Sequence, residues 1–206
     1  MIKNIIFDFD GTIADSFAVF VDALRVVSKN KKNFSDVEIE SLRKLSTREI
    51  IQALAIKKWQ LPILLFKGKR EISNNFQNVI PFTGIESVIF QLSTDHQLYI
   101  LSTNSQQTID TFLKKHQINQ YFCKVVGDVG LLGKAKSIKK LCKSENLDVK
   151  ESIYLGDETR DIEAAKKANI TICSVGWGYA DPNTLKKYKP DYFIDSPAQL
   201  LKVISN

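Results

Sequence analysis

The chain has 206 residues, of which 44% are hydrophobic and 25% charged, with a formal net charge of +6. This is the composition of an ordinary globular protein that is long enough for a sizeable core and one or two domains. The sequence contains no apolar run near the roughly 20 residues that span a bilayer, no basic leader before a long apolar segment, and no Cys-x-x-Cys pair. We therefore expect a cytoplasmic protein with no membrane partner and no zinc site.

The positive charge is spread along the chain. Lysines occur in small groups on expected helices and loops, namely Lys29, Lys31 and Lys32, Lys57 and Lys58, Lys139 and Lys140, and Lys186, Lys187 and Lys189. No single arm gathers them, so we interpret them as a solvated surface that attracts small anions. We expect no nucleic-acid partner, although a basic nucleic-acid binder stays open as an alternative.

After the first apolar run, the segment from 15 to 79 shows helical patterns and no convincing strand. Two capping-box patterns of the Ser-x-x-Glu type and a proline at a favoured first position mark helix starts within it. The expected helix starts are Ser16, Ser35, Ser46 and Pro62. We predict a helical cap domain at 15–79, inserted into a catalytic core domain made of 1–14 and 80–206.

Elsewhere, short apolar runs alternate with segments in which apolar residues recur every three or four positions. The runs are NIIFDFD, QLYILSTN, CKVVGD, SIYLGDE, ITICSVGWG and DYFIDS, and the helix-like segments include SQQTIDTFLKKHQI, KAKSIKKLCKSEN and TRDIEAAKKANI. This alternation predicts an α/β fold, a Rossmann-like three-layer sandwich around a mainly parallel sheet. Ligands of such sheets bind beyond the carboxyl ends of the strands, where the polar residues that end these runs should converge.

The first run ends in two acids, Asp8 and Asp10, followed by Gly11. Two residues apart on an extended segment, both carboxylates point the same way. Gly11 permits a tight turn and the close approach of a ligand. Paired carboxylates at a strand end suit Mg²⁺, and they also suit chemistry in which one acid attacks while the other moves a proton.

A second acidic cluster, SIYLGDETRD, ends a later run. Asp157 at this strand end should face the same crevice as Asp8, and Asp161 on the first helical turn could reach the cation directly or through water. Such a concentration of carboxylates needs positive charge. Mg²⁺ would supply most of it, and Lys134, at a helix start after a glycine-containing loop, would supply more.

The run YILSTNS supplies a candidate phosphate site. We expect its strand to end at Thr103 and Asn104 to begin the turn. A hydroxyl and backbone N–H groups at a helix start bind phosphate oxygens well. If Thr103 points into the crevice, Ser102 points to the other face, so we select Thr103.

In this order, FDFDGT, STN, the GK at Lys134 and GDETRD make the chain resemble the haloacid dehalogenase superfamily over nearly its whole length. Within that superfamily the chain looks most like the phosphoglycolate phosphatase-like branch with a small helical cap. The resemblance implies an enzyme, a phosphoric monoester hydrolase. An aspartate at position 8 with a second acid at position 10 argues against dehalogenation.

The resemblance also implies roles for the residues. Asp8 would attack phosphorus to give an aspartyl-phosphate, while Asp10 would protonate the leaving alcohol and then deprotonate water. Mg²⁺ would be bound by the side chains of Asp8, Asp157 and Asp161 and by the backbone carbonyl of Asp10.

The transferring phosphoryl group would be held by two side chains and by backbone N–H groups. The side chains are those of Thr103 and Lys134, and the N–H groups lie near Gly11 and Asn104. The substrate would be a small phosphorylated metabolite, with phosphoglycolate as a family-level candidate.

Two further alternatives remain open. One is a phosphomutase of the β-phosphoglucomutase type, which uses the same chemistry. The other is a non-enzymatic phosphoacceptor domain, although the helical insert and the Asp-x-Asp-Gly-Thr opening do not fit such a domain. The sequence leaves open whether the chain is a monomer or a homodimer.

Overall fold

The computed structural model describes residues 1–27, 36–45, 49, 52, 75–130 and 133–205. Its centre is a six-stranded sheet in the order β3-β2-β1-β4-β5-β6, in which all neighbouring strands are parallel. The strands are β1 (Asn4–Phe7), β2 (Gln97–Leu101), β3 (Phe122–Val126), β4 (Ser152–Gly156), β5 (Thr171–Val175) and β6 (Tyr192–Ile194). Five lie within the apolar runs and β3 begins one residue before its run, at Phe122, which confirms the predicted α/β fold.

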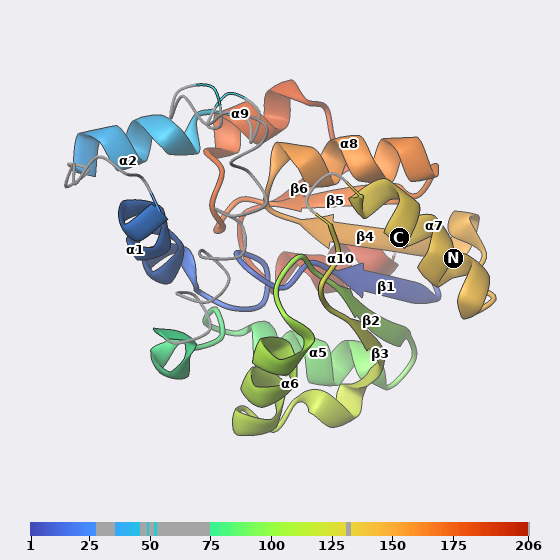
Figure 1. The fold of residues 1–206 in the computed structure, drawn as a ribbon. Coiled ribbons are helices and arrows are strands. Elements are labelled where there is room, and N and C mark those ends of the chain that lie inside the picture. Colours follow the sequence, from blue (N-terminus) through green and yellow to red (C-terminus); the bar gives the residue numbers. More distant parts are fainter. Residues whose placement is uncertain (28–35, 46–48, 50–51, 53–74, 131–132, 206) are drawn as a thin grey trace.

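Helices cover both faces of the sheet, so that the sheet is the middle layer of a three-layer sandwich (Figure 1). One face is covered by α5 (Ile85–Ser93), α6 (Gln106–Lys115) and α10 (Gln199–Ser205). The other face is covered by α7 (Lys134–Ser144), α8 (Thr159–Ala168) and α9 (Pro182–Lys187). Short 3₁₀ turns lie at Phe76–Asn78, Asn119–Tyr121 and Val149–Glu151.

The central strands read as continuous apolar runs because they are buried on both faces. Along β1, Ile5 and Phe7 pack into the core beneath α5 and α6, whereas Ile6 packs into the core beneath α7 and α8. Side chains alternate between the faces of a strand, so Asp8 follows Ile6 toward the α7 side. That alternation brings the first acid within reach of Lys134, the first residue of α7.

Two helices of the expected cap are described, α1 (Phe17–Val27) and α2 (Asp36–Arg43), and both lie beyond the carboxyl ends of the strands (Figure 1). The connections into and out of this region run side by side, because Asp15 N–H donates to the Ile80 carbonyl and Phe82 N–H donates to the Ile13 carbonyl. The helices expected from Ser46 and Pro62 fall almost wholly outside the described residues. The domain boundaries therefore stay a prediction.

None of the helices in the described ranges combines the length and the apolar character that crossing a membrane requires.

Candidate active site

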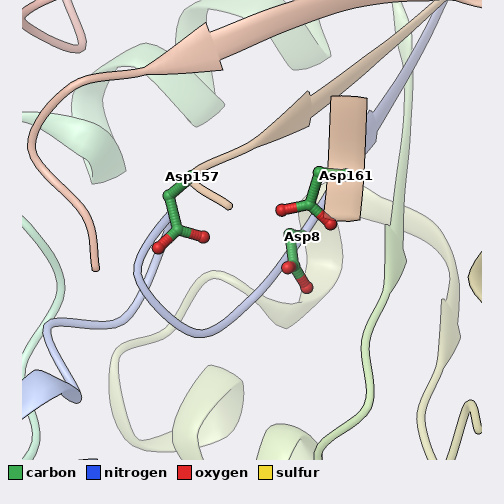
Figure 2. Close-up of side chains that lie close together, drawn as sticks. All are labelled: Asp8, Asp157 and Asp161. Atoms are coloured by element: carbon green, nitrogen blue, oxygen red, sulfur yellow. The ribbon is translucent and has the colours of Figure 1, made fainter. Parts of the chain in front are cut away.

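Three carboxylates meet at the carboxyl edge of the sheet, as Figure 2 shows. Asp8 follows β1, Asp157 follows β4, and Asp161 lies in the first turn of α8. One oxygen of each lies within 4.8 Å of the others, and none of the three residues is more than 2% exposed. The structure thus brings together acids that are more than a hundred residues apart in the sequence.

Lys134 lies among these acids. Its Nζ is 2.5 Å from Oδ2 of Asp8 and 2.5 Å from Oδ1 of Asp161, and the residue is 3% exposed. Burial lowers the pKa of Lys134, but Asp161 and Asp8 outweigh this effect and hold the pKa well above its ordinary value. Burial raises the pKa of Asp8 to about 7, although the charge of Lys134 opposes that rise. The lysine is therefore a permanent buried cation beside the expected nucleophile.

Asp157 is held by the backbone and by one hydroxyl. Its Oδ2 accepts a hydrogen bond from the Tyr179 N–H at 2.7 Å, and its Oδ1 accepts one from the Thr12 hydroxyl at 3.4 Å. Burial, followed by the charges of Glu158 and Asp161, raises the pKa of Asp157 well above its ordinary value. Ionising this group in the buried cluster is costly unless further positive charge is present.

The donor set fits Mg²⁺. Three buried carboxylates face one buried ammonium group, and the nearby Arg160 is paired with Glu158, which leaves an excess of negative charge. All the candidate ligand atoms are oxygens, which hard divalent cations prefer. Asp161 also has a structural role, since its Oδ2 accepts from the Glu158 N–H at 3.0 Å and completes a capping box at the start of α8.

Glycines allow the backbone to approach these acids. Gly11 has a φ of +72°, and a Cβ atom there would lie 2.0 Å from Oδ2 of Asp157. A Cβ atom at Gly156 would lie 2.5 Å from the carboxyl carbon of Asp161. In this structure the Asp157 carboxylate therefore occupies the space that a side chain at position 11 would need. The part of Gly11 in binding phosphate stays a prediction.

Asp10 is half-buried and lies beside the cluster. Its Oδ1 accepts from the Ser16 hydroxyl at 2.8 Å, and Nδ2 of Asn104 lies 3.1 and 3.0 Å from its two oxygens. Burial raises the pKa of Asp10, and the hydrogen bonds from Ser16 and Asn104 oppose that rise. The Asn104 side chain thus orients Asp10, while the Asn104 N–H donates to Oγ of Ser102 at 3.1 Å.

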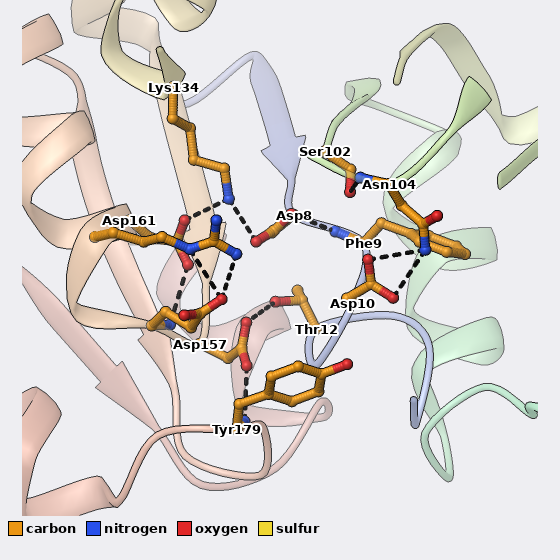
Figure 3. A network of polar contacts seen from close by, with 12 residues as sticks. Asp8, Phe9, Asp10, Thr12, Ser102, Asn104, Lys134, Asp157, Asp161 and Tyr179 are labelled. Atoms are coloured by element: carbon orange, nitrogen blue, oxygen red, sulfur yellow. Dashed lines mark hydrogen bonds and ion pairs between the residues drawn. The ribbon is translucent and has the colours of Figure 1, made fainter. Parts of the chain in front are cut away.

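The strand before Asn104 differs from the prediction, because β2 ends at Leu101 rather than at Thr103. The alternation of faces therefore does not continue through the two hydroxyl residues. Ser102 is 1% exposed and lies next to Asn104 in the polar network of Figure 3. Thr103 is half-buried, and within the described part of the chain its hydroxyl has no hydrogen-bond partner. Ser102 is therefore part of this network, and the part of Thr103 in binding phosphate stays a prediction.

Sequence reasoning missed three residues that contact the acids: Thr12, Ser16 and Tyr179. Tyr179 lies in the loop after β5, which the strand prediction covered only as far as its glycines. A usable signal was present, because the loops after neighbouring parallel strands meet at the same edge. The glycine at position 178 was a second signal, because glycine after a strand often marks a close approach of the backbone. In the structure a Cβ atom there would lie 2.3 Å from Cβ of Asp157.

The fold is an α/β sandwich whose carboxyl edge carries a cluster of acids able to hold a divalent cation. Residues 5–175 match the family model of the haloacid dehalogenase-like hydrolases, and the chain belongs to this family. A phosphoglycolate phosphatase of Synechococcus elongatus is 31% identical over 98% of this chain and 97% of its own length. A pyrophosphatase PpaX of Listeria monocytogenes is 25% identical over 98% of this chain and 96% of its own.

Solved structures agree on the fold. A haloacid dehalogenase-like family protein of Streptococcus pneumoniae superposes with a TM-score of 0.82 at 22% identity, covering 98% of both chains. These findings confirm the recognised family and the expectation that the chain is an enzyme of the phosphatase class.

Proposed function

We propose that the chain is a Mg²⁺-dependent phosphatase that hydrolyses a small phosphomonoester through an aspartyl-phosphate on Asp8. The observation that carries the proposal is the placement of Asp8, buried between Lys134 and the carboxylates of Asp157 and Asp161. The 31% identity with a phosphoglycolate phosphatase supports phosphoglycolate as the candidate substrate.

Asp8, Asp157 and Asp161 would hold Mg²⁺ through side-chain oxygens, with the backbone carbonyl of Asp10 as a fourth ligand. When bound, the cation would neutralise the carboxylates and the charge on the phosphoryl oxygens. Lys134 adds a fixed positive charge beside Asp8, where a transferring phosphoryl group carries negative charge. Nucleophilic attack and proton transfer are then carried out by Asp8 and Asp10.

An oxygen of Asp8 forms a bond to phosphorus as the bond to the leaving alcohol breaks, and Asp10 gives that alcohol its proton. Asp10 then accepts a proton from the water that attacks the phosphorus, and Asp8 is released. The raised pKa of Asp10, due mainly to burial, suits a group that is first an acid and then a base. Asp10 is fixed by Ser16 and Asn104 rather than by Lys134, which keeps the roles of the two acids apart.

The test is phosphate release in the presence of Mg²⁺ from 2-phosphoglycolate, glycerol phosphate, pyrophosphate and 4-nitrophenyl phosphate. The Asp8→Asn variant should fall to the rate of a blank without protein while its circular dichroism spectrum is unchanged. Asp95→Asn is the matched control, since Asp95 is exposed at the opposite edge of the sheet, and it should keep full activity.

Other outcomes identify the alternatives. Preference for pyrophosphate would place the chain with its PpaX relatives, and activity that requires an added sugar bisphosphate would indicate a phosphomutase. A stable aspartyl-phosphate without turnover would indicate a phosphoacceptor. No release from any compound would overturn the proposal.

The remaining predictions concern the setting of the enzyme. A small phosphorylated metabolite as partner accords with phosphatase relatives of similar length, and the cytoplasmic location stays a prediction. A monomer and a homodimer both remain compatible with the fold.

A further inference from the structure

Tyr179, in the loop between β5 and α9, contacts Asp157 directly and Asp10 through Ser16. Its N–H donates to Oδ2 of Asp157, and its ring extends from that carboxylate toward Asp10 (Figure 3). The loop is also fixed from the α2 side, because the Arg43 guanidinium donates to the carbonyls of Gly178 and Tyr179 at 3.0 Å each. The backbone of Tyr179 is therefore held from two directions.

The ring of Tyr179 packs against two aromatic rings of α1. Its centroid is 5.3 Å from that of Phe17 and 5.1 Å from that of Phe20, both on α1. These are ordinary distances for aromatic pairs, which add packing energy beyond the area that they bury. The position of the phenol oxygen is thus set by the core loop and by the first helix of the expected cap together.

The phenol oxygen lies 2.7 Å from Oγ of Ser16, which is 1% exposed and lies 2.8 Å from Oδ1 of Asp10. A serine hydroxyl carries one hydrogen and can accept two hydrogen bonds. When Ser16 donates its hydrogen to Asp10, the hydrogen between the two hydroxyls must come from Tyr179. The contacts then form a directed chain from Tyr179 through Ser16 to Asp10.

Ser16 has a competing acceptor, the carbonyl oxygen of Ala14, at 3.4 Å from its Oγ. A phenol that donates to Oγ occupies one side of the serine oxygen and favours the rotamer in which the serine hydrogen points at Asp10. Without the phenol group, Ser16 can turn its own hydrogen toward the Ala14 carbonyl. The Asp10 carboxyl would then be held by Asn104 alone.

We propose that Tyr179 is a positioning residue that acts through Ser16 to orient the Asp10 carboxyl group for proton transfer. This inference rests on the proposed function, because it assigns Asp10 the protons of that reaction. The phenol oxygen of Tyr179 contacts Ser16, and Ser16 in turn contacts Asp10. Removal of this phenol oxygen should therefore weaken proton transfer without weakening substrate binding.

The experiment compares two esters of similar shape whose leaving groups differ in their need for a proton. Phenyl phosphate releases a basic phenolate that benefits from protonation, whereas 4-nitrophenyl phosphate releases a stable anion. We expect Tyr179→Phe to lower kcat/KM for phenyl phosphate about 10-fold and for 4-nitrophenyl phosphate less than about 3-fold, a part of what general acid catalysis supplies. KM should stay near that of the native protein.

A double-mutant cycle tests the route through Ser16. Ser16→Ala should produce the same selective loss, and adding Tyr179→Phe to Ser16→Ala should lower the phenyl phosphate rate no further, because residues in one chain of contacts are not additive. Tyr192→Phe is the matched control, since Tyr192 lies exposed on the edge strand β6 and should leave both rates unchanged.

The outcomes separate the inference from the function beneath it. Equal losses on the two esters would show that Tyr179 only supports the fold, and additive effects with Ser16→Ala would show a route other than Ser16. Either result overturns the positioning role while the phosphatase stands. A native protein that hydrolyses neither ester would overturn the proposed function, and the inference with it.

Discussion

At the scale of single residues, Asp8 shows how burial and charge oppose each other in this site. Burial raises its pKa to about 7 despite the adjacent Lys134, whereas the same carboxyl in the unfolded chain titrates near its ordinary value of about 4. Between these two values the folded protein binds more protons than the unfolded chain. The contribution of Asp8 to stability is therefore fully present below about pH 4 and is lost as the pH rises from there through about 7.

A stability measurement without divalent metal tests this sign. We expect the free energy of unfolding of Asp8→Asn to rise relative to that of the native protein between pH 5 and pH 8, by about 3 kcal/mol at most. Urea denaturation in EDTA at each pH measures the difference. Asp95→Asn should show no such trend, and saturating Mg²⁺ should abolish it. A difference that stays constant with pH would contradict the assigned balance.

Single residues also show where sequence reasoning succeeds and where it stops. Asp8, Asp157 and Lys134 were predictable because strand ends and helix starts at one edge of a parallel sheet must converge. The choice between Ser102 and Thr103 depended on where β2 ends, and no periodic pattern fixes a strand end to one residue. The convergence of loops at the carboxyl edge pointed to the loop of Tyr179 but not to the residue itself, since a loop aromatic has no periodicity and its partners Ser16 and Asp157 are distant in sequence.

At the scale of elements, the strands and the helices of the core could be predicted because each buries a continuous or periodic set of apolar residues. What the sequence did not reveal is how the expected cap contacts the core. Arg43 ends α2, and its guanidinium lies 5.0 Å from the centroid of Phe17 while it binds two carbonyls of the loop after β5. The Asp181 N–H returns a hydrogen bond to the carbonyl of Arg43 at 2.9 Å.

These contacts make a clamp whose loss should loosen the loop that holds Asp157. In Arg43→Met the apolar stem over Phe17 is largely kept, but both charged hydrogen bonds disappear. We expect the Tyr179 amide to exchange its hydrogen about 10-fold faster, as for a local loss of about 1–2 kcal/mol. Hydrogen exchange of this amide, with core amides as the internal reference, measures the effect.

Arg43→Lys is the matched control for charge. One ammonium group cannot reproduce the fork that reaches two carbonyls, so we expect this variant to lie between the native protein and Arg43→Met. Unchanged exchange at Tyr179 in both variants would show that the loop is held without the clamp.

At the scale of the whole molecule, the candidate metal site exists only when the sheet is assembled. β1 and β4 are neighbours in space and lie far apart along the chain, and α8 must pack beside them to bring Asp161 to Asp8 and Asp157. The unfolded chain therefore has no equivalent site. A cation that binds the folded state alone stabilises the entire fold, by about 2.7 kcal/mol when its concentration is 100 times Kd.

For a chain of this length that stabilisation corresponds to a rise in Tm of about 5–10 °C. Thermal unfolding in MgCl₂, compared with NaCl of equal ionic strength, should show the rise in the native protein. Asp157→Asn removes one of the three clustered carboxylates and should lose most of it, while Asp95→Asn should keep it. An equal rise in all three proteins would place the Mg²⁺ effect outside this cluster and would remove the reason for assigning the metal to the carboxyl edge of the sheet.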